Sequence, residues 1–525
     1  MVRRQWLKWA AGAAMVGCGP EPSRAEPGTV AAPTAQPAAV PPTPVALPTR
    51  AREGVAVRPA DEAAWTALGE ALDGRLVRPN QSDYGRARLL FDPRFDHLRP
   101  DGIVYASTES DVQRCVAFSR EHALRFAARC GGHSYGGYSG GPGLVCDVGP
   151  MARVEHREGR AGIGAGAKLI DIYATLAASG ASIPGGSCPS VGIAGLTLGG
   201  GQGVLGRKLG LTSDAMRSVR LVTASGDLRT CSAEENSDLF WACQGGGGGN
   251  FGVATEFHLE AHPVAQLVRF AMPWSWSAAA DVIAAWQEWG PDAPDELWSK
   301  CEIGARADST SIAVHGVFMG TESDLRPHLD RLVTRVGARP RRRSVETAPL
   351  LESMLALGGC ARRTLEQCHL PPEGTMHRGI HLSRSHVIGT PLSSAGIARF
   401  VERMPRVGLA EGRGRVGFDA LGGAIARVAP DASAFVHRRA RFVAQYASYW
   451  SRNASAAHVA QSTAWLDRLH EAMAPHAAGA YVNYIDPRLE GWAEAYYGAN
   501  LARLRRIKAS VDPESVFRFA QGLVG

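Results

Sequence analysis

Two glycine-rich stretches constrain this chain of 525 residues more than any other feature. Residues 129–151 read RCGGHSYGGYSGGPGLVCDVGPM, and residues 185–206 read GGSCPSVGIAGLTLGGGQGVLG. Glycine lets backbone N–H groups approach a ligand closely, because it has no Cβ and adopts positive φ at little cost. Each stretch also carries one nucleophilic side chain, His133 in the first and Cys188 in the second. Together they predict a cofactor that is cradled by backbone and also covalently bonded.

The chemistry of His133 and Cys188 suits attachment to an electron-poor ring. Imidazole and thiolate are the soft nucleophiles that can add to such a ring at neutral pH. Two bonds would hold the ring rigidly and withdraw electron density, which raises its reduction potential. The alternative is a histidine in a tight turn and a structural cysteine. Because both residues lie in matching glycine-rich contexts, attachment is the favoured interpretation.

Both stretches resemble motifs of the berberine-bridge-enzyme-like flavoproteins, within the vanillyl-alcohol-oxidase group that has a PCMH-type FAD-binding domain. In that family R-S-G-G-H-S-Y carries a histidine linked to the 8α-methyl of the isoalloxazine, and G-x-C-P-x-V-G-[VI]-x-G-x-x-x-G-G-G carries a cysteine linked to C6. The resemblance covers the chain from about Asp96 onward and implies bicovalent FAD on His133 and Cys188. The same motifs imply further FAD contacts from Arg129, Gly131, Gly132, Ser134, Gly192, Ile193, Gly199, Gly200 and Gly201. Cys130 replaces the serine of the first motif.

Two later segments extend the resemblance. Residues 245–252 read GGGGGNFG where the family has a similar cluster that closes its FAD domain, which implies that Gly249, Asn250 and Gly252 lie close to the flavin. Residues 479–486 read GAYVNYID and begin a C-terminal signature that matches the family almost throughout. One departure is Phe519, which stands where the family has asparagine.

The Y-x-N-Y motif at residues 481–484 carries the candidate base. Period-two alternation predicts a strand with Tyr481 and Asn483 on one face and Tyr484 on the other. In sugar-oxidising relatives one tyrosine of this region is the base, so Tyr481 and Tyr484 are both candidates, and Asn483 is a candidate cofactor contact. Tyr135 lies where relatives present a tyrosine to the substrate. Because a phenol has a pKa near 10, the base needs a nearby cation or a hydrogen-bond network.

The N-terminus predicts export. Residues 3–8, RRQWLK, resemble a twin-arginine signal, and the apolar stretch that follows is shorter than the roughly 20 residues needed to span a bilayer. Residues 15–18, MVGC, resemble a lipobox, which makes Cys18 a candidate for lipid attachment and the only predicted membrane contact. Residues 19–52 are rich in Pro, Ala and Thr and predict a spacer. The protein is therefore expected in the periplasm or on the cell surface.

The rest of the chain is too long for one ordinary domain. We predict a FAD-binding domain at 53–264, a substrate-binding domain at 265–478, and a segment at 479–525 that returns to the first domain. Alternating strands and helices predict an α+β fold. The resemblance implies a two-subdomain PCMH-type domain and a second domain whose sheet is covered by helices. Candidates to line a substrate cleft in the second domain are His377, His381, Arg384, His386, Tyr446 and Tyr449.

Charge and cysteine spacing exclude other classes of function. The net charge is +7, and the single dense basic run, at 335–343, lacks interleaved aromatic residues, so nucleic acid is not expected as a partner. The ten cysteines match no zinc spacing, so no metal is expected. Disulfides are permitted in an exported protein, and the candidate pairs are Cys130 with Cys146, on neighbouring predicted strands, and the closely spaced Cys360 and Cys368.

The resemblance implies an exported FAD-dependent oxidase. It would oxidise a hydroxyl of a carbohydrate or natural-product alcohol by hydride transfer to flavin N5, and would reduce O2 to H2O2. Ile193 stands at the Val/Ile position that accompanies open oxygen access in relatives, whereas Leu196 departs from the histidine of plant members and argues against plant alkaloid chemistry. Two alternatives are an oxidative cyclase or dehydrogenase of secondary metabolism on the same scaffold, and a non-catalytic lipoprotein that binds flavin or glycan.

Overall fold

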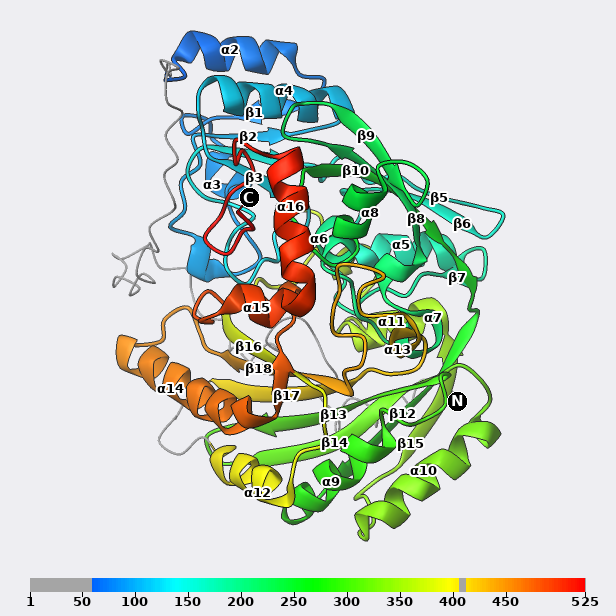
Figure 1. The fold of residues 1–525 in the computed structure, drawn as a ribbon. Coiled ribbons are helices and arrows are strands. Elements are labelled where there is room, and N and C mark those ends of the chain that lie inside the picture. The colour runs from blue at the N-terminus through cyan, green and yellow to red at the C-terminus, as the bar shows by residue number, and fades with distance from the viewer. Residues whose placement is uncertain (1–58, 406–411, 525) are drawn as a thin grey trace.

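A computed structural model describes residues 59–405 and 412–524 (Figure 1). The predicted signal at 1–18, with Cys18, and the spacer at 19–52 lie outside the described residues. Within the described ranges, no helix is both long and apolar enough to cross a membrane. The three larger sheets occupy successive parts of the chain, and the C-terminal helices pack back onto the first two.

The first sheet has four strands in the order β1-β2-β4-β3. β2 and β3 each pair in parallel with β4, and β1 pairs antiparallel with β2. The strands and the neighbouring helices are β1 (Arg75–Val77), β2 (Gly102–Tyr105), β3 (Phe126–Arg129), β4 (Leu144–Asp147), α2 (Glu62–Ala71), α3 (Tyr84–Ala87), η2 (Pro93–Phe95) and α4 (Glu109–Glu121). A capping box of Thr108 and Asp111 begins α4, and its apolar face is buried in the core.

The second sheet is antiparallel, with the order β5-β6-β10-β8-β9. Its strands are β5 (Val154–Arg157), β6 (Arg160–Gly164), β8 (Met216–Val222), β9 (Leu228–Ser232) and β10 (Val253–Glu260). The adjoining helices are α5 (Leu169–Ala177), α6 (Ile193–Leu198), α7 (Gly206–Leu209), η3 (Thr212–Ala215) and α8 (Ser237–Cys243), and a small separate pair is formed by β7 (Ala181–Ser182) and β11 (His262–Pro263). One continuous hydrophobic core joins the first two sheets.

The third sheet has eight antiparallel strands in the order β15-β12-β14-β13-β17-β18-β16-β19. They are β12 (Gln266–Trp274), β13 (Leu297–Ala305), β14 (Thr310–Phe318), β15 (Ser344–Pro349), β16 (His381–Ile388), β17 (Arg413–Ala420), β18 (Phe442–Tyr449) and β19 (Ala477–Gly479). Four long helices cover the outer face: α9 (Ala279–Trp289), α10 (Glu322–Val336), α12 (Ser394–Arg403) and α14 (Ala456–Met473). Figure 1 shows the first two sheets beyond the uncovered face. The predicted α+β fold, with a sheet covered by helices, is confirmed.

Shorter elements complete the chain. They are η4 (Trp276–Ala278), α11 (Leu350–Leu357), η5 (Glu366–Cys368), α13 (Ala424–Arg427), η6 (Ala474–His476), η7 (Val482–Tyr484), α15 (Trp492–Tyr497), η8 (Gly498–Asn500) and α16 (Leu501–Val511). The last helix, α16, lies beside α8, where Arg503 forms an ion pair with Asp238. The C-terminal segment thus contacts the first two sheets.

The strand predicted for the Y-x-N-Y motif is wrong. Residues 482–484 form the 3₁₀ turn η7, closed by the N–H of Tyr484 donating to the carbonyl of Tyr481 at 2.9 Å. The turn brings Asn483 back toward α6, where its Nδ2 donates to the carbonyl of Leu196 at 2.9 Å. This contact with a distant segment outweighs the local alternation of residue types.

Two stacked histidines, His386 on β16 and His470 on α14, predict acid sensitivity. The rings of His386 and His470 lie 3.8 Å apart, centroid to centroid. Burial, followed by nearby positive charge, lowers the pKa of His386 to about 2 and that of His470 to about 3. In the unfolded chain both titrate near 6.5, so the unfolded state gains protons first as the pH falls. Stability is therefore unaffected above about pH 6.5 and is lost below it, by about 2 kcal/mol per histidine at pH 5.

Urea unfolding at pH 7.5 and pH 5.0 measures this effect. His470→Gln should lose less stability between the two pH values than the wild type, because one titrating group is gone. The exposed His377, changed to glutamine, is the control and should leave the pH difference as it is. An equal loss in wild type and His470→Gln would contradict the assignment.

Candidate active site

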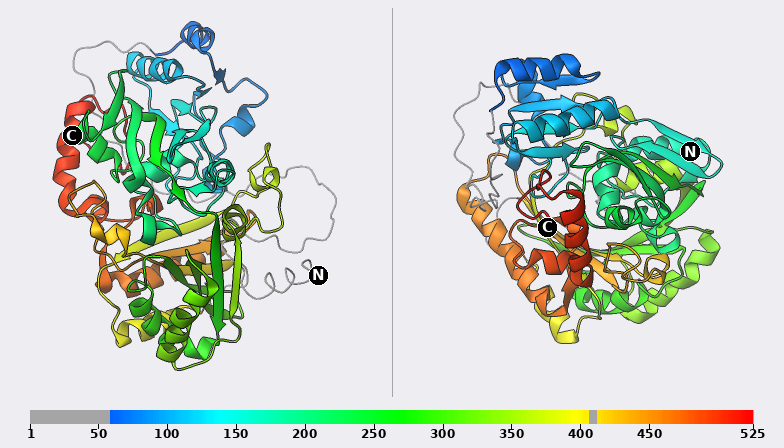
Figure 2. Two further views of the ribbon diagram at one scale, coloured as in Figure 1. Left: turned by 90° about the vertical axis from the view of Figure 1, so that its right-hand side faces the viewer. Right: turned by 45° about the horizontal axis from the view of Figure 1, so that its top comes forward.

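A cavity of about 370 Å³ lies between the first two sheets and the uncovered face of the third. Its walls include residues from all three glycine clusters, from the inner face of the eight-stranded sheet, and from the Y-x-N-Y turn. Figure 2 shows the same arrangement from two further directions, with the first two sheets packed above the third. Segments that are far apart in the sequence therefore meet at one site.

The loops that carry His133 and Cys188 are in contact. His133 follows β3, and its Nε2 lies 3.0 Å from the Oγ of Ser190, in the second glycine-rich stretch. A Cβ on Gly131 would lie 2.5 Å from the backbone nitrogen of Gly192, so the two backbones meet where glycine is required. Both His133 and Cys188 line the cavity. The predicted convergence of the two stretches is therefore present in the structure.

His133 is held as a neutral imidazole. Its ring stacks on that of Phe91 at 4.0 Å between centroids. Burial, with smaller contributions from His381 and Lys168, lowers the pKa of His133 to about 3. At neutral pH one ring nitrogen therefore keeps its lone pair, as nucleophilic attachment requires.

Most of the predicted cofactor contacts line the cavity. They are His133, Cys188, Arg129, Gly131, Gly132, Ser134, Gly192, Gly249, Asn250, Gly252 and Asn483. Four others do not: Ile193, Gly199, Gly200 and Gly201. A Cβ on Gly199 would lie 2.0 Å from Oδ1 of Asn483, and one on Gly201 would lie 2.4 Å from Oγ1 of Thr212. Glycine at these two positions serves close packing behind the cavity wall.

The cavity wall offers donors for a ligand with anionic groups, such as FAD. Gly195 lines the cavity, and a Cβ built on it would meet no atom within 4 Å, so its backbone faces open space. Arg129 donates from Nε to Asp147 at 2.6 Å, while its buried Nη1 has no hydrogen-bond partner among the described residues. Gly249 has φ of +79°, which glycine adopts without strain. Backbone and guanidinium donors are therefore present where the glycine clusters predicted a cofactor.

The three candidate catalytic tyrosines line the same cavity. The prediction that Tyr481 and Tyr484 lie on opposite faces is wrong, because the 3₁₀ turn places their rings 5.1 Å apart. Tyr484 also stacks on Tyr135, with 5.8 Å between ring centroids. The hydroxyl of Tyr135 accepts a hydrogen bond from Nε2 of Gln445 at 2.9 Å.

The hydroxyls of Tyr481 and Tyr484 differ in their partners. That of Tyr481 accepts from the N–H of Gly201 at 3.0 Å, the N–H of Gln202 at 3.2 Å and Nδ2 of Asn483 at 2.9 Å. That of Tyr484 accepts from Nε2 of Gln202 at 2.9 Å. Burial raises the pKa of both phenols, and Asp419 raises that of Tyr484 further. Tyr481 thus joins two segments of the wall, whereas Tyr484 keeps capacity for another partner.

The sequence analysis missed a charged network on the inner face of the third sheet. Lys300 on β13 is opposite both His315 on β14 and Asp419 on β17, and its Nζ lies 3.1 Å from Oδ2 of Asp419. Nearby, Nη2 of Arg415 lies 2.8 Å from Oε2 of Glu302. Lys300, His315, Arg415 and Asp419 line the cavity. The available signal was the alternation of charged and apolar residues in β13, where Lys300 and Glu302 flank Cys301.

Glu302 and Arg415 keep their charges despite burial. Burial alone would raise the pKa of Glu302, but Arg415 and then His315 outweigh it and hold that pKa well below its usual range. Burial would likewise lower the pKa of Arg415, but Glu302, followed by Tyr449, Asp419 and Tyr484, raises it. Arg415 is therefore a permanent cation near Tyr484 and Tyr449.

Two of the six cleft candidates line the cavity, His381 and Tyr449. The other four are placed elsewhere. Tyr446 is fully buried in the core between the third sheet and its covering helices, and its hydroxyl lies 3.3 Å from Nδ1 of His386. Arg384 forms ion pairs with Asp486 and Asp467, and His377 is exposed.

Family models match two parts of the chain. The FAD binding domain model matches residues 100–232, and the model described as berberine and berberine like matches residues 480–523. An uncharacterized FAD-linked oxidoreductase of Bacillus subtilis, YgaK, is 34% identical over 462 residues, which is 86% of this chain and 97% of that protein. A chitooligosaccharide oxidase of Gibberella zeae is 28% identical over 445 residues, 81% of this chain and 87% of that protein.

Solved structures show the same fold. Physcomitrella patens BBE-like 1 superimposes with a TM-score of 0.79 at 28% identity, covering 87% of this chain and 98% of that one. The carbohydrate oxidase from Microdochium nivale superimposes with a TM-score of 0.77 at 26% identity, covering 87% and 99%. The chain belongs to the berberine-bridge-enzyme-like family of FAD-linked oxidoreductases and has its PCMH-type FAD-binding fold.

Proposed function

We propose that this protein is an oxidase that holds FAD through both His133 and Cys188 and oxidises a hydroxyl group of a carbohydrate or natural-product alcohol. When bound, FAD accepts hydride from the carbon that bears the hydroxyl and passes two electrons to O2, giving H2O2. The observation that carries the proposal is the convergence of the two nucleophile loops and the tyrosines on one cavity. A binding protein would need neither the two nucleophiles nor a buried base.

We assign the role of base to Tyr484. Its oxygen accepts one hydrogen bond, from Gln202, and in the phenolate form it can take the proton of a substrate hydroxyl and become a neutral phenol. Burial and Asp419 raise the pKa of the free phenol, and the bond from Gln202 and the nearby cation Arg415 oppose that shift. Tyr481 holds the wall through its three donors and is a positioning residue in this mechanism. Tyr135 stacks on Tyr484 and so orients its ring.

The roof of the cavity, which is the inner face of the third sheet, suits a ligand rich in hydroxyl groups. Trp298 and Tyr449 provide aromatic surface, and Lys300, Arg415 and Gln445 provide donors from one face of the sheet. Aromatic faces together with charged donors form a surface on which a sugar ring can stack and hydrogen-bond. The names of two relatives, a chitooligosaccharide oxidase and a carbohydrate oxidase, support the same substrate class.

Export and lipid attachment are part of the proposal. The twin-arginine pattern at residues 3–8 and the lipobox ending at Cys18 support it. The disulfide between Cys360 and Cys368 agrees with an oxidising compartment. Fractionation of cells that express the full chain, with Cys18→Ala as the comparison, tests both steps. The wild type should be found with membranes, and the variant should not.

Acid precipitation tests covalent attachment. The wild type should keep its yellow colour in the pellet, and His133→Ala or Cys188→Ala should each keep a singly linked, less oxidising flavin. The double variant should release all colour to the supernatant. Unchanged attachment in both single variants and in the double variant would contradict the assignment.

The acceptor is tested on the same preparation. Substrate that bleaches the flavin and releases peroxide in air supports an oxidase. Bleaching without peroxide would instead indicate a dehydrogenase on this scaffold.

A further inference from the structure

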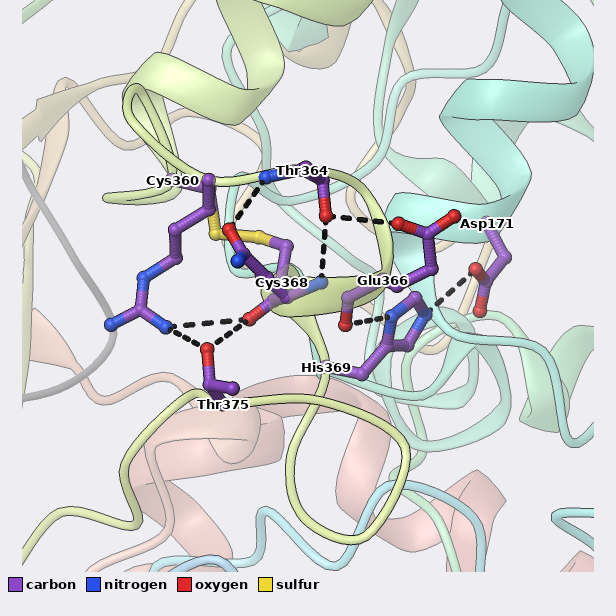
Figure 3. Close-up of a disulfide and its surroundings, with 9 residues drawn as sticks. Asp171, Cys360, Thr364, Glu366, Cys368, His369 and Thr375 are labelled. Atoms are coloured by element: carbon purple, nitrogen blue, oxygen red, sulfur yellow. Dashed lines mark hydrogen bonds and ion pairs between the residues drawn. A yellow bond between two sulfur atoms is a disulfide. The ribbon is translucent and has the colours of Figure 1, made fainter.

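A long segment of the chain connects two residues of the cavity wall. Leu357, at the end of α11, and His381, at the start of β16, both line the cavity. The segment between them, residues 358–380, which we call the strap, is closed on itself by the disulfide Cys360–Cys368 (Figure 3). Both sulfur-bearing side chains are buried. The strap is therefore a compact unit tied to the cavity at both ends.

The first residue of the strap packs closely against the part of the second glycine-rich stretch around Cys188, residues 187–191, which we call the Cys188 loop. A Cβ on Gly358 would lie 2.7 Å from Cγ of Pro189 and 2.9 Å from the carbonyl oxygen of Ser187. The backbone of the strap thus touches the residues on both sides of Cys188. The disulfide packs against Ile170 in α5, whose N–H donates to the carbonyl of Pro189 at 3.2 Å.

A hydrogen bond joins the strap to α5 one residue beyond the disulfide. Nε2 of His369 lies 2.8 Å from Oδ1 of Asp171 (Figure 3). The other ring nitrogen of His369 lies 3.2 Å from the carbonyl of Glu366, within the strap. Helix α5 also bonds the end of the Cys188 loop, because the N–H of Leu169 donates to the carbonyl of Val191 at 3.0 Å. The strap and the Cys188 loop therefore share α5 as a support.

The end of the strap is hydrogen-bonded to residues 90 and 96, which lie next to the loop that carries His133. Nε of Arg378 donates to the carbonyl of Leu90 at 2.6 Å, and its Nη1 bonds Oδ2 of Asp96 at 3.1 Å. Phe91, which follows Leu90, donates its N–H to the carbonyl of Gly132 at 3.1 Å, and its ring stacks on that of His133. One short segment is thus anchored beside both nucleophiles.

We propose that the disulfide-closed strap is a positioning element that holds the Cys188 and His133 loops at the spacing at which both reach one flavin ring. The disulfide matters because it keeps the strap short between its two anchors. Without it, the additional chain freedom loosens both contacts. The inference rests on the proposed bicovalent attachment, but its mechanical part can be measured on its own.

Hydrogen exchange of the flavin-loaded protein tests the mechanical part. In Cys360→Ser/Cys368→Ser, amides in residues 185–192 and 88–97 should exchange several-fold faster than in the wild type. Cys301→Ser, which removes a buried thiol from β13, is the control and should leave both segments unchanged. Arg378→Gln keeps the disulfide and should loosen residues 88–97 alone. Unchanged exchange of both segments in the double variant overturns the proposal.

The linkage pattern tests the consequence for attachment. In Cys360→Ser/Cys368→Ser, mass analysis of flavin-bearing peptides should show less flavin linked to both His133 and Cys188 and more flavin linked to only one of them. The flavin should then be less oxidising in a reductive titration. Faster exchange with complete linkage at both residues would overturn the positioning role. If the wild type carries no covalent flavin, the proposed attachment fails, and the exchange result alone decides whether the strap holds the loops.

Discussion

Tyr484→Phe should lower the rate of flavin reduction by substrate by about 10²- to 10⁴-fold, because general-base catalysis contributes that much. The flavin should stay attached, since the hydroxyl that is removed accepts a hydrogen bond from Gln202 and is not one of the two attachment residues. The ring is retained, so the stacking on Tyr135 is preserved. Anaerobic stopped-flow measurement of flavin bleaching separates this step from the reaction with O2.

Tyr481→Phe is the matched control. It leaves the N–H groups of Gly201 and Gln202 without their acceptor, so it should lower stability by about 1–3 kcal/mol. Bleaching should be slowed less than in Tyr484→Phe and should keep the wild-type pH profile, because the base is present. The reverse result, a greater loss of rate and a lost pH dependence in Tyr481→Phe, would transfer the role of base to Tyr481.

The nucleophile loops were predictable from the sequence because each is a local pattern. Glycine spacing and one reactive side chain identify each loop, and contact between the loops follows if both serve one ring. The structure adds the bond between His133 and Ser190, which joins the stretches directly. The resemblance to a family gave the order of the motifs, and the comparisons confirm that family.

The charged roof was not predictable in the same way. Lys300 and Asp419 become neighbours through the pairing of β13 with β17, which are joined by more than a hundred residues of chain. No local spacing encodes that register. The alternation in the Y-x-N-Y motif misled for a related reason, since a contact between Asn483 and Leu196 makes the chain turn. Packing also explains Gly199 and Gly201, whose neighbours come from other segments.

Lys508→Met should destabilise the fold by about 3–5 kcal/mol, because it leaves a buried carboxylate without its cation. Nζ of Lys508 lies 2.6 Å from Oδ2 of Asp512, and both side chains are 0% exposed. The same ammonium donates to the carbonyls of Asn250 and Phe517, each at 2.7 Å. Both of those residues line the cavity, so the ammonium also ties the C-terminal segment to the predicted cofactor site.

Lys208→Met is a closely matched control for that prediction. Its Nζ lies at the same 2.6 Å from Glu296, but the two side chains are 42% and 34% exposed. An exposed pair contributes about 0–1 kcal/mol, so this variant should unfold in urea close to the wild type. Equal effects of the two substitutions would show that burial of the Lys508 pair does not determine its contribution. A large loss in Lys508→Met alone would show that the C-terminal segment depends on one buried charge, and flavin fluorescence during the same titration would show whether the cavity opens with it.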